Sequence, residues 1–198
     1  ENELPDGWVI AKLGDIAAPG GTWNPNANDA GEFLYVDIEA VDNTAQRIVA
    51  PKRLPVANAP SRARMAIRAG DVIFSLVRPY LKNIAIVSHE LDGQVASTAY
   101  CVMRPEMGIT SSYIFYAVLR ESFIDSIKTY GNSPPSAHDD EFFAMDIPVA
   151  PATEQHRILA IIEQQFSRLD AAVTSLQHAR AKLKRQRAAI LKAAVEGT

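Results

Sequence analysis

The chain has 198 residues, 47% of them hydrophobic, which is enough apolar material for a buried core. A formal net charge of −3 argues against a protein that simply coats nucleic acid, and a single cysteine, Cys101, excludes a disulfide framework and a thiolate metal cluster. No apolar run is long enough to span a membrane, and the first residues lack the pattern of a signal peptide, so we expect a cytoplasmic protein.

Short strands and turns dominate the first hundred residues. A turn followed by a strand or a short helix is expected at residues 5–16, and later strands are expected at 33–41, 68–77, 83–88 and 97–105. These strands are too short and too closely spaced to alternate with helices. The sequence therefore predicts an α+β fold, with a globular mixed β-sheet domain that carries short helices.

One clear helix is expected from Ser111 to Tyr130. Ser111 or Thr110 can cap its start, and its apolar residues lie on one helical face, which indicates packing on a core. A loop of polar residues follows and leads to a short turn or helix around Phe142 and Phe143.

Three connections carry residue types that contact ligands. Residues 18–33 form a long loop around Trp23, an aromatic residue that looks exposed; residues 78–82, Arg-Pro-Tyr-Leu-Lys, join two strands; and residues 131–141 form the third connection. An ordinary solvated loop is the alternative for the first two. The acidic residues after His138 suit the start of a helix, where they complement the backbone dipole, so we expect no metal site.

The charge is distributed unevenly along the chain. From Thr153 to the end there are eight Lys or Arg and four Asp or Glu, which leaves twelve basic and nineteen acidic residues before it. Because the globular part is net acidic, DNA binding there would require a local basic surface. Five cations precede the strand at 68–77 and would matter only if folding gathered them on one face: Arg47, Lys52, Arg53, Arg62 and Arg64.

The segment Thr153–Glu196 is predicted to be one unbroken helix, because it lacks Gly and Pro and is rich in helix-forming residues. At about 1.5 Å per residue it is about 65 Å long, which exceeds what a chain of this size needs to cover its own core. Its apolar residues alternate at spacings of four and three, as in a coiled-coil seam. The seam residues are Ile162, Phe166, Leu169, Val173, Leu176, Leu183 and Ile190. A second helix is the expected partner, and packing on its own domain is the alternative.

Several short motifs occur in a recognisable order: LPDGW and KLGDI near the start, GGT in the first loop, AGDVIFSLVRPYL, a Gly-Asn-Ser-x-Pro loop, and IPVAPATEQHRI leading into a helix that ends QRAAILKAAVEG. Together they resemble the specificity subunit of type I DNA restriction-modification enzymes over nearly the whole chain. The resemblance implies a target recognition domain at residues 1–150 and a conserved spacer helix at residues 151–198. A full subunit of that family has two such units, so the chain is expected to be a fragment or a half-length subunit that pairs with itself.

The resemblance also implies a noncatalytic subunit that reads one half of a bipartite target in double-stranded DNA and docks methyltransferase and restriction subunits through the long helix. The residues agree, since they contain no glycine-rich motif for S-adenosylmethionine, no Asn-Pro-Pro-Tyr-like motif and no P-loop. S-adenosylmethionine, ATP and Mg would belong to the partner subunits. A coiled-coil adaptor that never contacts DNA is the competing hypothesis, and the acidic globular part favours it. A hydrolase ranks last, because no active site can be located.

Sequence reading requires side chains that reach base edges, together with cations and hydroxyls that bind phosphate. The predicted DNA contacts follow from loop chemistry: Trp23, Asn24 and Asn26 in the first connection, Arg78, Tyr80 and Lys82 in the second, and Asn132, Ser133, Ser136 and His138 in the third. The basic segment RAKLKRQR of the long helix is expected to keep a helix bundle solvated or to contact the methyltransferase, and facing the DNA spacer is the alternative.

Overall fold

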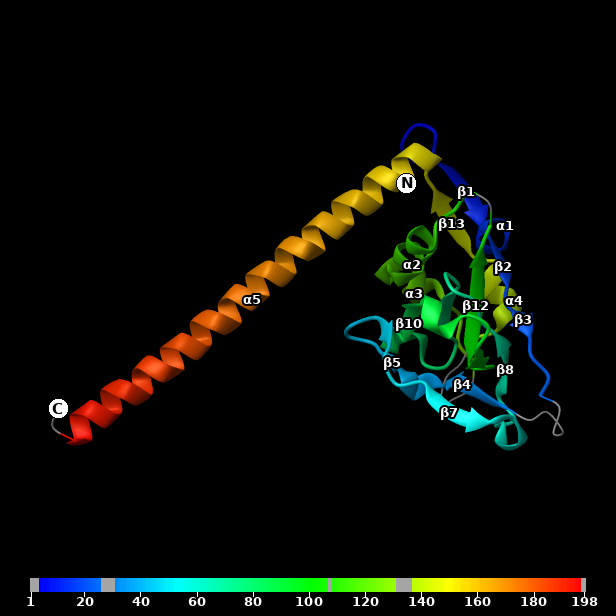
Figure 1. Ribbon diagram of the computed structural model, residues 1–198. Helices are drawn as coiled ribbons and strands as arrows, with labels where there is room; N and C mark the ends of the chain where they lie inside the picture. The colour runs from blue at the N-terminus through cyan, green and yellow to red at the C-terminus, as the bar shows by residue number, and fades with distance from the viewer. Residues whose placement is uncertain (1–3, 26–30, 107, 131–136, 197–198) are drawn as a thin grey trace. The chain divides into compact units, whose positions relative to one another are not determined.

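A computed structural model describes residues 4–25, 31–106, 108–130 and 137–196 of the chain (Figure 1). The chain divides into two compact units, Glu1–Ala152 and Thr153–Thr198. Short strands and short helices build the first, globular unit, and a single helix makes up the second. The predicted α+β fold, a mixed-sheet domain followed by one long helix, is confirmed.

A four-stranded antiparallel sheet runs through the middle of the globular unit. Its strands, in spatial order, are β10 (Ile84–Ile86), β9 (Val72–Ser75), β12 (Tyr100–Pro105) and β2 (Ala17–Pro19). Both faces of β9 are buried, since Phe74 packs with the short helices while its neighbour Ile73 packs on the opposite side with a second sheet. Successive side chains of a strand alternate between faces, so this apolar strand joins two hydrophobic clusters.

The second sheet has five strands of mixed direction. In spatial order they are β3 (Gly21–Thr22), β8 (Ala63–Ala66), β11 (Val95–Ser97), β4 (Glu32–Val36) and β7 (Lys52–Pro55). β11 pairs in parallel with β4, and the other pairs are antiparallel. On β4, Val36 faces the cluster shared with the first sheet, whereas Phe33 and Tyr35 belong to a smaller cluster on the outer face.

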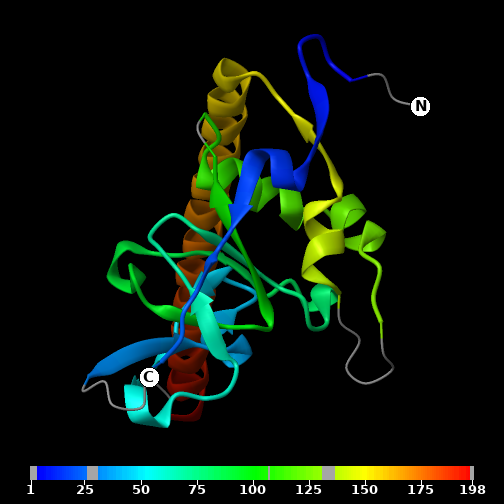
Figure 2. The same cartoon turned by 90° about the vertical axis from the view of Figure 1, so that its right-hand side faces the viewer.

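Four short helices cover the other face of the first sheet. They are α1 (Leu13–Ile16), α2 (Ser111–Leu119), α3 (Glu121–Ser126) and α4 (Asp139–Phe143). Figure 2 shows these helices on one side of the globular unit and the five-stranded sheet on the other. Of the two residues predicted to cap α2, Thr110 does so, because its Oγ1 accepts a hydrogen bond from the Tyr113 N–H at 3.2 Å.

The prediction of one helix over residues 111–130 is wrong, because the chain breaks at Arg120, whose φ of −61° and ψ of 138° are extended. The Arg120 carbonyl accepts a hydrogen bond from the Phe123 N–H at 3.1 Å, and α3 begins there. The break turns Phe123 into the core, where its ring lies 5.4 Å from that of Phe142. Burying a phenylalanine stabilises a fold by about 1.5–3 kcal/mol, so tertiary packing ends α2 without Gly or Pro.

Two small antiparallel pairs complete the strands. β1 (Val9–Lys12) pairs with β13 (Asp146–Val149), and β5 (Val41–Asp42) pairs with β6 (Arg47–Ile48) to form the β5–β6 hairpin. Four short 3-10 turns lie between strands, namely η1 (Ile38–Ala40), η2 (Val56–Asn58), η3 (Pro79–Leu81) and η4 (His89–Leu91). The loop expected at residues 18–33 therefore begins as strands β2 and β3, and the strand expected at 33–41 is β4 followed by η1.

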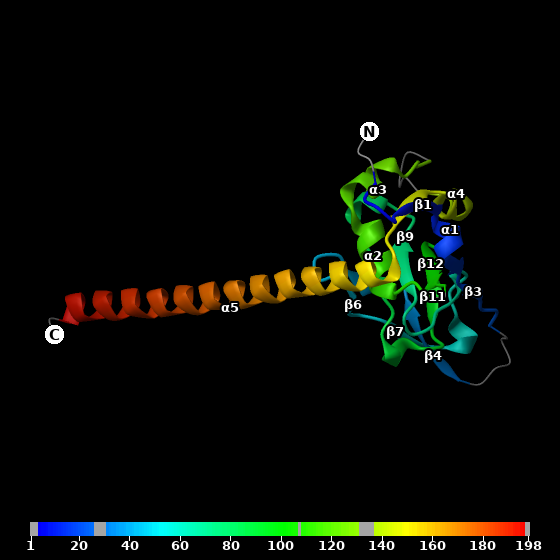
Figure 3. The ribbon, with the colours of Figure 1, turned by 90° about the horizontal axis from the view of Figure 1, so that it is seen from above.

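The helix α5 (Ala152–Glu196) runs without interruption for 45 residues (Figure 1 and Figure 3). At about 1.5 Å per residue it is about 67 Å long. Within the described parts of the chain, no helix is both long and apolar enough to cross a membrane.

Candidate nucleic-acid interface

The segment 78–82, which we call the η3 turn, displays apolar side chains on a fixed backbone. Its first and last residues, Arg78 and Lys82, both adopt the left-handed conformation, with φ of 51° and 54°. Pro79 is buried, and the Lys82 N–H donates to the Pro79 carbonyl at 3.0 Å. Tyr80 and Leu81 are 58% and 39% exposed at its tip. An exposed aromatic ring flanked by two cations suits contact with nucleic acid.

The two cations of the η3 turn differ in their surroundings. Lys82 forms an ion pair with Glu121, at the start of α3, so part of its charge is already compensated. Arg78 is exposed and forms no ion pair with any residue that the structure describes. Of the two, Arg78 is therefore the cation with its donors available to a ligand.

The third predicted connection adjoins the second. Ala137 N–H donates to the carbonyl of Leu76, at the end of β9, with a distance of 2.8 Å. His138 is exposed, and its ring lies 4.7 Å from that of Tyr130. The Tyr130 hydroxyl donates to the Glu141 carboxylate at 2.7 Å, and this hydrogen bond raises the pKa of Tyr130. Three further predicted contacts, Asn132, Ser133 and Ser136, lie outside the described residues.

The first predicted connection lies on a different sheet. Trp23 follows β3, an edge strand of the five-stranded sheet, and its N–H donates to the Arg64 carbonyl at 2.6 Å. Its ring lies 4.7 Å from that of Phe33 and is half-buried, so the expectation of an exposed aromatic is wrong: packing against the small cluster on the outer face of the sheet partly covers it. Asn24 is exposed, and Asn26 lies outside the described residues. No hydrogen bond or ion pair in the described ranges joins Trp23 or Asn24 to the η3 turn.

Three of the five scattered cations already contact neighbouring groups of the protein. Lys52 pairs with Asp37, Arg53 lies 3.5 Å from Glu32, and Arg64 donates to backbone carbonyls. These cations bind groups of the sheet on which they lie. Arg47 is different, because it lies on the β5–β6 hairpin, which contacts the η3 turn through a hydrogen bond from Asn43 Nδ2 to the Leu81 carbonyl at 3.0 Å.

Two of the sequence motifs have structural roles. In AGDVIF, Asp71 is 1% exposed and accepts hydrogen bonds from Arg104 Nε at 3.0 Å and Nη2 at 2.8 Å, so it ties β9 to β12. This partner raises the pKa of Arg104. In GGT, a Cβ on Gly20 would lie 2.6 Å from the Cβ of Val102, a distance that only glycine permits. These motif residues hold the sheets together and leave ligand contact to the loops.

Two features of the described residues bear on chemistry. No group of three or more His, Cys, Asp or Glu side chains among them could hold a metal ion. Cys101 is fully buried in β12, and burial raises the pKa of its thiol well above the usual value, so it is a poor nucleophile.

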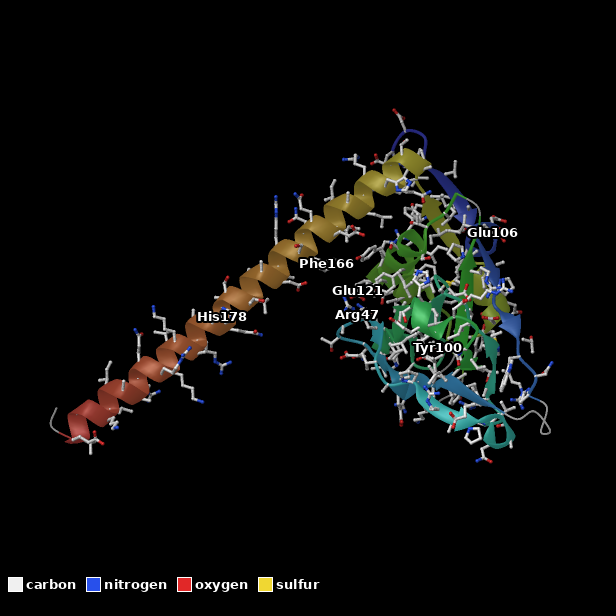
Figure 4. The ribbon with its side chains drawn as sticks, in the orientation of Figure 1. Arg47, Tyr100, Glu106, Glu121, Phe166 and His178 are labelled. Carbon is white, nitrogen blue, oxygen red and sulfur yellow. The ribbon has the colours of Figure 1, made fainter. Side chains whose placement is uncertain are left out.

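The seam predicted on α5 is an exposed apolar stripe. Leu169, Leu176, Leu183 and Ile190 are 57%, 69%, 66% and 69% exposed, and Phe166 and Val173 are 50% and 43% exposed, while Ile162 is half-buried. Figure 4 shows Phe166 and His178 projecting from this helix. A row of large apolar side chains this exposed is a feature of interaction surfaces.

Comparison with known proteins identifies relatives of one kind. No family model matches the chain. The type I restriction enzyme EcoDI specificity subunit of Escherichia coli is 25% identical over 137 residues, which cover 68% of this chain and 30% of that protein. The HindI specificity subunit of Haemophilus influenzae is 26% identical over 112 residues, covering 54% and 24%.

Solved structures extend the match to most of the chain. The HsdS subunit from Thermoanaerobacter tengcongensis superposes with a TM-score of 0.80 at 39% identity, over 86% of this chain and 45% of that one. A chain from a structure describing complex assembly and conformational transition of the type I restriction-modification system gives a TM-score of 0.79 at 37% identity, over 94% of this chain and 48% of that one. The chain thus spans less than half the length of the relatives it matches. It is a partial-length homologue of the specificity subunits of type I restriction-modification systems.

Proposed function

We propose that the chain is a noncatalytic recognition unit that reads one half of a bipartite DNA target for a type I restriction-modification enzyme. The observation that supports this most strongly is the 37% identity over 94% of the chain to a protein of a type I restriction-modification assembly. The match spans the globular unit and the long helix together, as expected if the chain performs both parts of the task, reading and assembly.

DNA reading is assigned to the globular unit. In this proposal the η3 turn enters a groove of the duplex, where Arg78 donates to guanine and Tyr80 packs against a base or sugar. Lys82 and His138 bind phosphate and fix the register. Trp23 and Asn24 form a second contact region at the other sheet. Asn26, Asn132, Ser133 and Ser136, which lie outside the described residues, are proposed as further contacts. The units 1–150 and 151–198 would then act as recognition domain and spacer.

Assembly is assigned to α5. Its apolar stripe would pack against a second such helix, supplied by another copy of the chain or by a second unit of the same polypeptide. The pair would hold two recognition domains over the two halves of the target and present a platform for methyltransferase and restriction subunits. S-adenosylmethionine, ATP and Mg would be bound by those subunits, so this chain would supply specificity and no chemistry.

The test is selection from a randomised duplex pool, with the chain alone and with type I methyltransferase subunits, followed by sequencing of the retained DNA. We expect enrichment of a short motif, single or split. Arg78→Ala should then reduce affinity for the enriched duplex by about 1–3 kcal/mol, or about five- to 140-fold, and relax the preference at one base pair. Equal losses on enriched and scrambled duplexes would contradict base reading by Arg78.

The acidic globular unit favours a second candidate, a coiled-coil adaptor that does not contact DNA. The two candidates differ in salt dependence, because each neutralised phosphate contributes about −0.9 to the slope of log affinity against log salt. A wild-type chain that binds methyltransferase subunits but retains no duplex, alone or in the complex, would establish the adaptor and exclude the recognition unit.

A further inference from the structure

Backbone strain is concentrated at one place in the globular unit. Among the residues that the structure describes, the non-glycine residues with positive φ are Gln46, at 54°, Arg78, at 51°, and Lys82, at 54°. A left-handed conformation destabilises a residue with a side chain by about 1–2 kcal/mol, and such strained positions cluster at binding sites. Two of the three are the first and last residues of the η3 turn, and the third lies in the β5–β6 hairpin.

The hairpin and the η3 turn form one continuous surface. Asn43 Nδ2 donates to the Leu81 carbonyl at 3.0 Å, which joins the tip of the hairpin to the tip of the turn. The hairpin is itself well ordered by hydrogen bonds, since Asp42 Oδ1 accepts from the N–H groups of Thr44 and Ala45 at 2.8 and 3.0 Å. These bonds, with that of Ala45 the strongest contributor, lower the pKa of Asp42.

Arg47 points away from the core on this hairpin. Its neighbour Ile48 packs against the hydrophobic cluster between the two sheets, so the alternation of a strand places Arg47 on the opposite side, where it is exposed. It forms no ion pair with any described residue, whereas Lys52 and Arg53, a few residues later, do. Figure 4 shows Arg47 and Glu121, the partner of Lys82, on the same flank of the globular unit.

From this arrangement we propose that the β5–β6 hairpin is part of the DNA-binding surface and that Arg47 binds a backbone phosphate beside the groove entered by the η3 turn. The inference rests on the proposed DNA-reading function and adds a contact to it. A B-form major groove is about 12 Å wide and admits one narrow element. The exposed tip of the η3 turn fills that role, so the adjoining hairpin meets the phosphates along the groove edge. A phosphate there recognises the Arg47 guanidinium by its charge and its paired donors.

The test uses the full chain, in complex with methyltransferase subunits if the complex is needed for binding, and compares Arg47→Ala, Arg47→Lys and a control, Arg53→Ala. The control removes the same charge from an exposed site on β7, where the cation lies 3.5 Å from Glu32. At about 0.1 M salt, loss of one phosphate contact should weaken binding by about eightfold, equally on enriched and scrambled duplexes. A fourfold rise in salt should then weaken the wild type about 3.5-fold more than Arg47→Ala. Arg47→Lys should restore most of the affinity and the salt slope.

Three results would overturn the inference. Arg47→Ala with wild-type affinity and slope would show that the hairpin does not touch DNA. An equal loss for Arg53→Ala would show that net charge alone is responsible. A change of preference confined to one base pair would show that Arg47 reads a base and not a phosphate. Wild-type thermal unfolding of each variant, followed by circular dichroism, excludes misfolding as the cause of a loss.

The failure of this inference is distinguishable from failure of the proposed function. If the wild type retains no duplex in any condition, the DNA-reading function fails and the contact fails with it. If the wild type binds DNA, and if Arg78→Ala weakens this binding while Arg47→Ala does not, then only the proposed role of the hairpin is wrong.

Discussion

Replacing Leu176 and Leu183 by Glu should separate the helix pair that we assign to α5. These residues are 69% and 66% exposed in the single chain. Pairing can therefore still bury about two thirds of the surface of each side chain. Full burial of a leucine is worth about 1.5–3 kcal/mol, which leaves about 1–2 kcal/mol per side chain. A symmetric pair contains four of them. The double substitution therefore removes about 4–8 kcal/mol and raises the dissociation constant by about a thousandfold or more.

Sedimentation velocity over a concentration series measures this directly. The wild type should sediment as a pair, and the double variant as a single chain at all accessible concentrations. The matched control is Ser175→Glu with Ala181→Glu, which adds the same charge at exposed positions outside the seam. The control should remain paired. A double variant with the mass of the wild-type pair, or a control that dissociates as readily, would refute the seam.

Two further predictions concern the sequence motifs with structural roles. Arg104→Met leaves the buried Asp71 carboxylate without its cation and should reduce the free energy of unfolding by about 3 kcal/mol, because breaking a buried ion pair exposes one charge to an apolar environment; an unchanged midpoint in urea would contradict this. Gly20→Ala should destabilise the fold by about 1–3 kcal/mol through overpacking, whereas Gly21→Ala, whose added Cβ would meet its nearest neighbour at 3.7 Å, should be close to neutral in the same assay. Equal losses for the two alanines would show that close approach at Gly20 is not the reason for glycine there.

Most elements could be predicted because their signals are local. The alternation of apolar residues in β9, the Thr110 cap and the absence of Gly and Pro from α5 each act within a few residues. The break at Arg120 could not be predicted in this way. It carries no local stop signal, and it exists because Phe123 gains more from packing on Phe142 than the helix gains from continuing.

The candidate site shows the same division. The residue types of the η3 turn were evident in the sequence, but the hairpin that adjoins it was not, because the contact between Asn43 and Leu81 joins segments 38 residues apart. Trp23 was assigned to the same kind of loop as Tyr80, and only tertiary packing with Phe33 distinguishes the half-buried ring from the exposed one. The left-handed backbone of Arg78 could not be predicted from the sequence either, since this conformation is uncommon for arginine.

Net charge is a poor guide to this surface, because part of the charge of the globular unit is paired internally. Carboxylates neutralise Lys12, Lys52, Arg53 and Arg104 within the globular unit, and these pairs contribute to packing and to strand pairing. Among the described residues, Arg78 and Arg47 form no ion pair, and Arg47 lies on the hairpin that is joined to the η3 turn. An acidic domain can bind DNA when its carboxylates lie away from the contact surface, since the field beyond about 10 Å is screened and local charge decides the contact.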